Sequence, residues 1–340
     1  MHHPETTVLL RTGDKINLKD INSGGIKIEG SRTGLHNFRI MVSDDNKTLI
    51  LIPDIVFLHG EKVAVSINHQ SGLLSDDHPE IFSFNFNISK NDLRTTSPDP
   101  VPYNTARPPY TFPALDITMS GNYYDEPLFF YIITALASNH DRFLTIIEPD
   151  GSIIYALQRD NEGLGFILQD SGYLSYFSMG KFMLMDSLYN IVDSFKCGNG
   201  YFTDWHEFQH LKNGHALLFS YDNQSVDMSQ IVAGGDTNAV VEGLVIQEID
   251  TDKNIVFQWR SWDYYEITDA THVDFLDSYF SYVHGNALEL SNDSNILLSS
   301  RLMDEITKID RNTGDIIWRC GGKNNEFTFI NDTGMFSRQH

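Results

Sequence analysis

Alternating apolar and polar residues predict short strands in the first quarter of the chain. Residues 63–67 read Val-Ala-Val-Ser-Ile, and similar runs begin at Phe38 and Leu49, with turn-forming residues between them. Short strands with period-two alternation and regular turns are typical of an antiparallel sandwich, in which each sheet buries one face. We therefore expect an Ig-like β-sandwich over residues 1–92.

The next stretch, residues 93–112, is polar and carries five prolines. Proline has no backbone N–H to donate and restricts the residue before it, so a proline cluster disfavours both a helix and a sheet interior. We interpret residues 93–112 as a Pro-rich linker and residues 113–340 as a second domain.

The second domain contains an internal repeat. An apolar strand, a tight turn rich in Asp, Asn and Gly, and a second strand recur four times, and the second strands begin at the equivalent residues Ile153, Ile191, Ile255 and Ile316. These isoleucines are 38, 64 and 61 residues apart, and a further hairpin precedes most of the units. Four-stranded units with insertions of variable length predict a β-propeller, and a generic run of hairpins is the alternative.

The expected fold is therefore all-β, with an N-terminal β-sandwich followed by a β-propeller. Residues 113–340 contain four units and the beginning of a fifth. An open ring would leave strand edges unpaired, so we expect this propeller to be incomplete and truncated at its C-terminus.

Composition narrows the classes of partner. The chain has 24 Lys and Arg against 46 Asp and Glu, a formal net charge of −22, and no basic run, which excludes nucleic acid as an expected partner. No apolar run approaches the roughly 18 residues of a membrane span, so no membrane partner is expected. Cys197 and Cys320 lie in no C-x-x-C pair, so neither a disulfide framework nor a thiolate zinc site is indicated.

Residues in the same phase of successive blades converge on the propeller axis, because the innermost strand of each blade lines the central channel. His206 lies five residues before Leu211, and His284 lies six before the equivalent Leu290. We therefore expect these two imidazoles to face each other near the axis. His340 has nearly the same phase in the next unit.

Arg301 follows the predicted strand 296–300 and is expected at the same end of the channel. Imidazole is a nucleophile and a base near neutral pH, and guanidinium offers a planar fork of donors to anionic oxygens. The set His206, His284, Arg301 and His340 therefore suits transfer of a charged tetrahedral group. The alternative is that these are polar channel residues bonded only to water.

A competing motif overlaps this set. Residues 206–210, His-Glu-Phe-Gln-His, match H-E-x-x-H, in which two histidines one helical turn apart bind zinc. The motif requires a helix, and strand-like sequence follows too closely to leave room for one. On a strand, His206 and His210 would lie about 13 Å apart, too far for one zinc ion. A zinc hydrolase is therefore the weaker alternative, and we expect no metal.

Five segments carry a resemblance to a known family. They are 204–214 (DWHEFQHLKNG), 283–289 (VHGNALE), 298–310 (LSSRLMDEITKID), 316–322 (IIWRCGG) and 336–340 (FSRQH). Together they resemble the arylsulfate sulfotransferase family over about residues 113–340, and the block from His284 to Gly322 is the specific part. Members of that family are six-bladed propellers behind a small β-sandwich.

The resemblance implies an enzyme that moves a sulfuryl group from an aryl sulfate to a phenol, through a sulfated histidine and without a nucleotide cofactor. By motif, His340 would be sulfated, and His284 and Arg301 would bind the sulfuryl oxygens. His206 would protonate the leaving phenolate or activate the acceptor. The alternative is a non-catalytic propeller that binds a glycan or a protein.

Three aromatic residues, Trp205, Tyr264 and Tyr265, are candidates for binding the phenolic ring, with core packing as the alternative use of each. The expected partners are a small aryl sulfate and a phenol, with no cofactor, and a homodimer is left open. The resemblance alone implies a periplasmic or secreted location, reached with a leader that these residues do not include.

Overall fold

A computed structural model describes residues 2–11, 14–44, 46–74, 81–90, 126–133, 141–160 and 164–330. Within these ranges every element longer than three residues is a strand, which confirms the all-β fold class. None of the helices there is long and apolar enough to cross a membrane. The predicted linker 93–112 and His340 lie outside the described residues.

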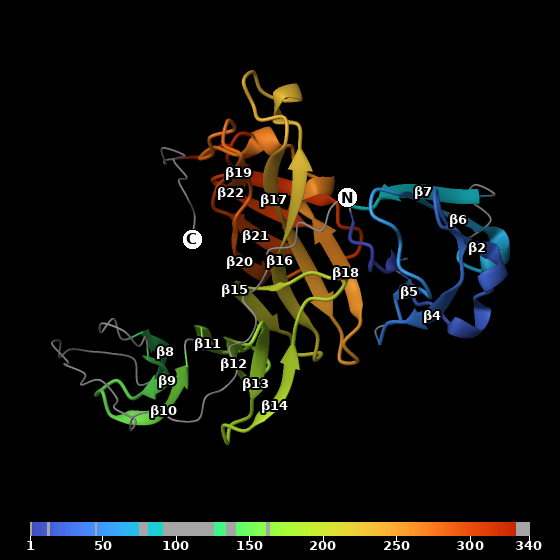
Figure 1. The fold of residues 1–340 in the computed structure, drawn as a ribbon. Helices are drawn as coiled ribbons and strands as arrows, with labels where there is room; N and C mark the ends of the chain where they lie inside the picture. The colour runs from blue at the N-terminus through green and yellow to red at the C-terminus, as the bar shows by residue number, and fades with distance from the viewer. Residues whose placement is uncertain are drawn as a thin grey trace.

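Strands β1 to β7 form the N-terminal sandwich from two sheets, with the orders β1-β5-β4 and β3-β2-β6-β7 (Figure 1). Val63 and Val65 of β6 and Leu49 and Leu51 of β5 meet in one hydrophobic core between the sheets. Buried and exposed side chains alternate along β6, as the sequence pattern predicted. The boundaries at 92 and 112 stay predictions. The strands are β1 Val8–Arg11, β2 Ile26–Gly30, β3 Gly34–His36, β4 Phe38–Val42, β5 Thr48–Pro53, β6 Lys62–Asn68 and β7 Ile81–Asn87.

The remaining strands form four sheets in which consecutive strands pair antiparallel, and these sheets are propeller blades. Their orders are β10-β9-β8, β11-β12-β13-β14, β15-β16-β17-β18 and β20-β21-β22-β23, and β19 pairs in parallel with β17. The strands are β8 Leu128–Ile133, β9 Asp141–Ile147, β10 Ile153–Asp160, β11 Leu164–Leu168, β12 Leu174–Ser178, β13 Lys181–Met185, β14 Ile191–Phe195, β15 Thr203–His210, β16 Ala216–Val226, β17 Ala239–Ile249, β18 Ile255–Arg260, β19 Tyr279–Ser281, β20 Gly285–Leu290, β21 Ile296–Ser300, β22 Glu305–Ile309 and β23 Ile316–Gly321. The 3-10 helices are η1 Leu18–Asp20, η2 Ser23–Gly25, η3 His69–Ser71, η4 Met228–Gln230, η5 Ser261–Asp263 and η6 Ile267–Asp269.

The first described strands of successive blades lie next to one another, β8 beside β11, β11 beside β15, and β15 beside β20 (Figure 1). The other strands of each blade follow outward from this line in chain order. The line of first strands is therefore the inner edge of the propeller, and we call it the hub.

The outer strands confirm the repeat. The four isoleucines that the sequence equated are the first residues of β10, β14, β18 and β23. Each of these strands then carries one extra residue relative to its partner, a β-bulge at the same place in all four blades: Ile154, Val192, Val256 and Ile317. A shared irregularity of this kind indicates four copies of one unit.

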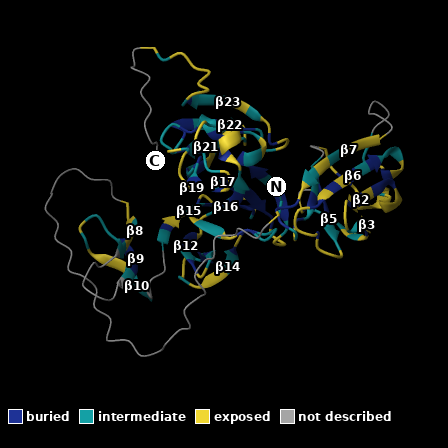
Figure 2. Ribbon diagram, turned by 45° about the horizontal axis from the view of Figure 1, so that its top comes forward, coloured by how far each residue is buried: buried dark blue, intermediate teal, exposed yellow. Residues whose placement is uncertain are grey.

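The sandwich docks on the bulge of β18. The bulge residue is 41% exposed at Ile154, 50% at Val192 and 44% at Ile317, but Val256 is 0% exposed. Figure 2 shows the exposed colour on β14, whose first two residues, Ile191 and Val192, are exposed. The hydroxyl of Thr48 in β5 donates a hydrogen bond of 2.9 Å to the carbonyl oxygen of Val256. The same repeat position is therefore a free surface in three blades and a domain contact in one.

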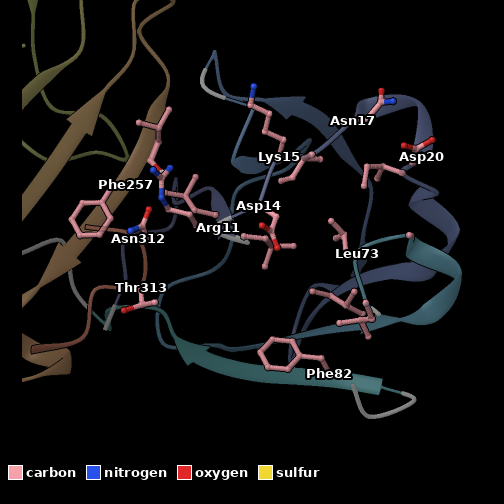
Figure 3. Close-up of a pocket in the computed structure, with 18 of the residues that line it drawn as sticks. Arg11, Asp14, Lys15, Asn17, Asp20, Leu73, Phe82, Phe257, Asn312 and Thr313 are labelled. Atoms are coloured by element: carbon pink, nitrogen blue, oxygen red, sulfur yellow. Dashed lines mark hydrogen bonds between the residues drawn. The ribbon is translucent and has the colours of Figure 1, made fainter. Parts of the chain in front are cut away.

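An interdomain groove of about 790 Å³ lies beside this contact. Figure 3 shows Lys15, Leu73 and Phe82 of the sandwich on one side, and Phe257 and Asn312 of the propeller on the other. The sandwich meets the propeller through contacts of β1 and β5 with β18, and the groove opens beside these contacts.

An ion cluster that is buried at His215 and Glu248 also joins the domains. His215 Nδ1 lies 2.5 Å from Glu248 Oε1, and its Nε2 lies 2.8 Å from Asp44 Oδ1 in the sandwich. Arg311 of the next blade donates two hydrogen bonds to Glu248. Burial lowers the pKa of His215, but the hydrogen bonds and charges of Glu248 and Asp44 outweigh burial, so the net pKa is raised.

We predict that His215→Gln destabilises the protein more at pH 6 than at pH 8.5. An imidazole with a raised folded pKa contributes fully below its ordinary value of about 6.5 and loses that contribution as pH rises through the folded value. The expected loss at pH 6 is about 1–3 kcal/mol, by urea unfolding. His69→Gln, in a 3-10 helix of the sandwich, serves as the matched control substitution. Equal losses at both pH values for His215→Gln would contradict the assignment.

Candidate active site

The strand that carries His206 bulges at that histidine. Thr203 pairs with Ser220 and Phe208 pairs with Leu218, so β15 takes five steps where β16 takes two. Residues 204–207 therefore leave the ladder. Bulges of this kind re-aim side chains and occur next to active sites. Here the bulge lies on the hub, where β15 faces β20.

His206 and His284 lie together on the hub. Their ring centroids are 5.2 Å apart with the rings at 74°, an edge-to-face contact. His206 lies inside β15, and His284 immediately precedes β20. His284 has a φ of 49°, an uncommon conformation for a residue with a side chain.

Asp204 orients the imidazole of His206. Its Oδ1 lies 2.7 Å from His206 Nδ1 and also accepts the backbone N–H of His206 at 2.8 Å. An ionised carboxylate only accepts hydrogen bonds, so Nδ1 carries a proton and Nε2 of the neutral ring is free to act as a base. The indole of Trp205, which is 42% exposed, stacks on the same ring at 4.0 Å.

Arg301 is tied to His284 through the backbone. It follows β21, and its N–H donates a 2.9 Å hydrogen bond to the carbonyl oxygen of His284. Its side-chain Nε is buried and has no hydrogen-bond partner among the described residues. A buried donor without a partner calls for an explanation, and an anionic ligand would supply one.

A long hairpin extends from the same end of the hub. β16 and β17 continue past the blade, and Tyr221 at the base of the extension donates its hydroxyl to the carbonyl oxygen of Gly285 at 3.2 Å. Burial raises the pKa of Glu242 on β17, which accepts a hydrogen bond from Tyr279. The extension therefore places the hydroxyl of Tyr221 against the residue that follows His284.

Sequence reasoning missed Asp204 and Tyr221. An Asp two residues before a chosen histidine is the pattern of an Asx turn, so Asp204 was within reach of the sequence. Tyr221 was not, because its contact with Gly285 spans 64 residues and depends on the length of an insertion.

The two tyrosines proposed with Trp205 pack elsewhere. Tyr264 stacks on Trp259 of β18 at 5.4 Å. Tyr265 is buried, and its hydroxyl donates a 2.5 Å hydrogen bond to Thr307. Both fit the alternative of core packing, because Trp259 belongs to the outer strand of its blade.

The H-E-x-x-H residues lie on a strand, as argued from their surroundings. β15 spans Thr203–His210, and His210 is bonded through Nδ1 to Ser171 at 2.7 Å. In the described part of the chain, no three His, Cys, Asp or Glu side chains are grouped as metal ligands.

Comparison with known proteins identifies a family. The family model described as Arylsulfotransferase (ASST) matches residues 118–329, more than half of the chain. A comparison of this chain with curated proteins found no match.

Solved structures resemble the chain only distantly. A protein of unknown function from Bacteroides caccae is 11% identical, over 56% of this chain and 58% of its own, with a TM-score of 0.34. A streptogramin B lyase is 8% identical over 56% and 57%, with a TM-score of 0.30. Virginiamycin B lyase from Staphylococcus aureus is 9% identical over 92% and 72%, with a TM-score of 0.28. The chain thus spans less than two thirds of the length of the first two proteins. With TM-scores this low, the three structures say nothing about the function of this chain.

We predict that neutral His206 is protonated at Nδ1 and that Asp204→Asn removes this preference. The carboxylate holds the tautomer because it accepts the Nδ1 hydrogen bond at 2.7 Å. Histidine ¹⁵N chemical shifts, recorded above the imidazole titration, report the protonated nitrogen directly. An unchanged His206 spectrum in Asp204→Asn would show that Asp204 does not fix the ring.

Proposed function

Because this chain belongs to the arylsulfotransferase family, we propose that it transfers a sulfuryl group from an aryl sulfate to a phenol without a nucleotide cofactor. The observation that carries the proposal is the contact of His206 with His284 at 5.2 Å, on a hub where Arg301 is bonded to His284. Two imidazoles and a guanidinium fit a small anion better than they fit water, because the guanidinium keeps its charge.

The proposed reaction has two balanced steps. An imidazole nitrogen of His340 attacks the sulfur, an N–S bond forms, and the S–O bond to the aryl group breaks with its electron pair on the aryl oxygen. That oxygen takes a proton and leaves as a phenol. The acceptor phenol then loses its proton, its oxygen attacks the sulfur, and the N–S bond breaks to regenerate His340. The role of His340 rests on the Gln-His motif alone, since it lies outside the described residues.

The other residues take roles that suit their surroundings. Arg301 and His284 would stabilise the sulfuryl oxygens, which carry the charge in a loose, in-line transfer. His206, held by Asp204, would exchange the proton with the leaving and accepting phenols. Trp205 is exposed beside His206, where its indole could stack on an aryl ring. A periplasmic or secreted location belongs to this proposal and rests on the family alone.

We predict that the protein turns over a chromogenic aryl sulfate repeatedly only when an acceptor phenol is present, and that it releases at most one phenol per chain without the acceptor. His340→Asn should abolish turnover, and Arg301→Met should lower kcat by about 10²–10³, the effect of removing one charge-stabilising donor. His210→Asn is the matched control: its imidazole lies on the same strand but is bonded to Ser171, so activity should persist.

Three results would contradict the proposal. Full activity in His340→Asn would exclude a sulfated His340. Ligand binding without turnover, unaffected by changes at His284 and Arg301, would favour the non-catalytic propeller. Loss of activity together with bound metal in His210→Asn would favour a zinc enzyme.

A further inference from the structure

The inner strands of neighbouring blades are joined by side chains. Leu288 pairs with Leu298 of its own blade, while its N–H and C=O both bond to side chains of β15. Glu207 Oε2 accepts the N–H at 3.1 Å, and Gln209 Nε2 donates to the carbonyl oxygen. We call this pair of bonds to Leu288 the Glu207 clasp.

The same device occurs one blade earlier. Gln169, which follows β11, accepts the backbone N–H of His210 at 2.8 Å and donates to the carbonyl oxygen of Phe208 at 3.2 Å. The single neutral amide of Gln169 thus binds one N–H and one C=O of the next inner strand, a task that Glu207 and Gln209 share at Leu288. A carboxylate is therefore not needed merely to join two inner strands.

Glu207 differs from Gln169 in where it lies. It closes the bulge at residues 204–207, directly after His206, and its Oε1 accepts the N–H of Phe208 at 3.0 Å. Its other oxygen holds Leu288, four residues after His284. One carboxylate thus fixes the end of the bulge on β15 and the strand on β20.

We propose that Glu207 is a positioning residue for the sulfuryl transfer described above, which holds the bulge bearing His206 against the strand that follows His284. This inference rests on the proposed function for its kinetic consequence, but the spacing of the two imidazoles is a property of the molecule that does not depend on it. Glu207 touches no reacting group in this role and acts through the two histidines.

Burial raises the pKa of Glu207 to about 7, although the hydrogen bonds from Leu288 and Phe208 lower it. Glu289 on β20 adds to the rise, and the other charged or titratable groups around the same cavity of about 640 Å³ are His210, Lys212, Arg311 and Asp170. The ionised carboxylate accepts both N–H groups, whereas the neutral acid turns one oxygen into a donor that faces an N–H.

The pH dependences of stability and positioning therefore oppose each other. Because the folded pKa is raised, the contribution of the neutral acid to stability is full below the ordinary value of about 4.3 and is lost as pH rises through 7. The two-point grip on β15 and β20 is complete only above 7. A residue with a purely structural role would give a single trend.

The test compares Glu207→Ala, Glu207→Gln and Gln169→Ala in the whole protein. Glu207→Ala should lower kcat by about 10- to 100-fold with little change in KM, since small misplacements of reacting groups cost this much. Glu207→Gln keeps one acceptor for Leu288, so it should recover most of kcat and lose the dependence on pH near 7. Gln169→Ala removes the buried amide of the other clasp and should lower the melting temperature while leaving kcat within about twofold of wild type.

A second measurement does not require turnover. Histidine ¹H–¹⁵N spectra across pH should show altered titration of His206 and His284 in both Glu207 variants, and unaltered titration in Gln169→Ala. An inactive wild type would refute the proposed function and leave this readout in place. Wild-type imidazole spectra in Glu207→Ala and Glu207→Gln, or equal losses of kcat in Glu207→Ala and Gln169→Ala, would overturn the positioning role.

Discussion

The inner edge of each blade sets the central constraint on this structure. The first strand of a blade pairs with a neighbouring strand on one side only. The N–H and C=O groups on its other edge must therefore find hydrogen-bond partners that are not in a neighbouring strand. On the hub these come from side chains: Gln169 serves β15, and Glu207 with Gln209 serves β20. The lengths of these bridging side chains therefore set the distance between the inner strands of neighbouring blades.

The same edge is where the candidate chemistry lies. A strand fully paired on both sides could not bulge at residues 204–207 without breaking a second ladder, whereas β15 loses pairing with β16 alone. The bulge lets Asp204 and His206 form their local hydrogen bonds while Glu207 reaches the next blade. One short segment, residues 204–207, thus both supplies hydrogen bonds to the unpaired edge of β20 and positions His206.

Much of the fold followed from the sequence because repeats and alternation are local signals. The four isoleucines that the repeat equates begin the four outer strands. His206 and His284, which have nearly the same phase in successive repeats, are in ring contact. The exclusion of a helix at residues 206–210 also held, since β15 is a strand.

The remaining details depend on contacts between distant residues. The Glu207 clasp joins positions 81 residues apart. The three extra residues in β15 and the positive φ of His284 cannot be detected in the pattern of hydrophobic residues. Tyr265 illustrates a second limit: an aromatic residue near a site in sequence packs equally well in the core, and only its neighbours in space decide.

The outer bulge has an evolutionary consequence. Duplication of a blade copies its irregularities together with its strands, so the apolar step that anchors the sandwich at Val256 also exists at Ile154, Val192 and Ile317. The sandwich occupies the β18 copy of a surface step that the other three blades also carry.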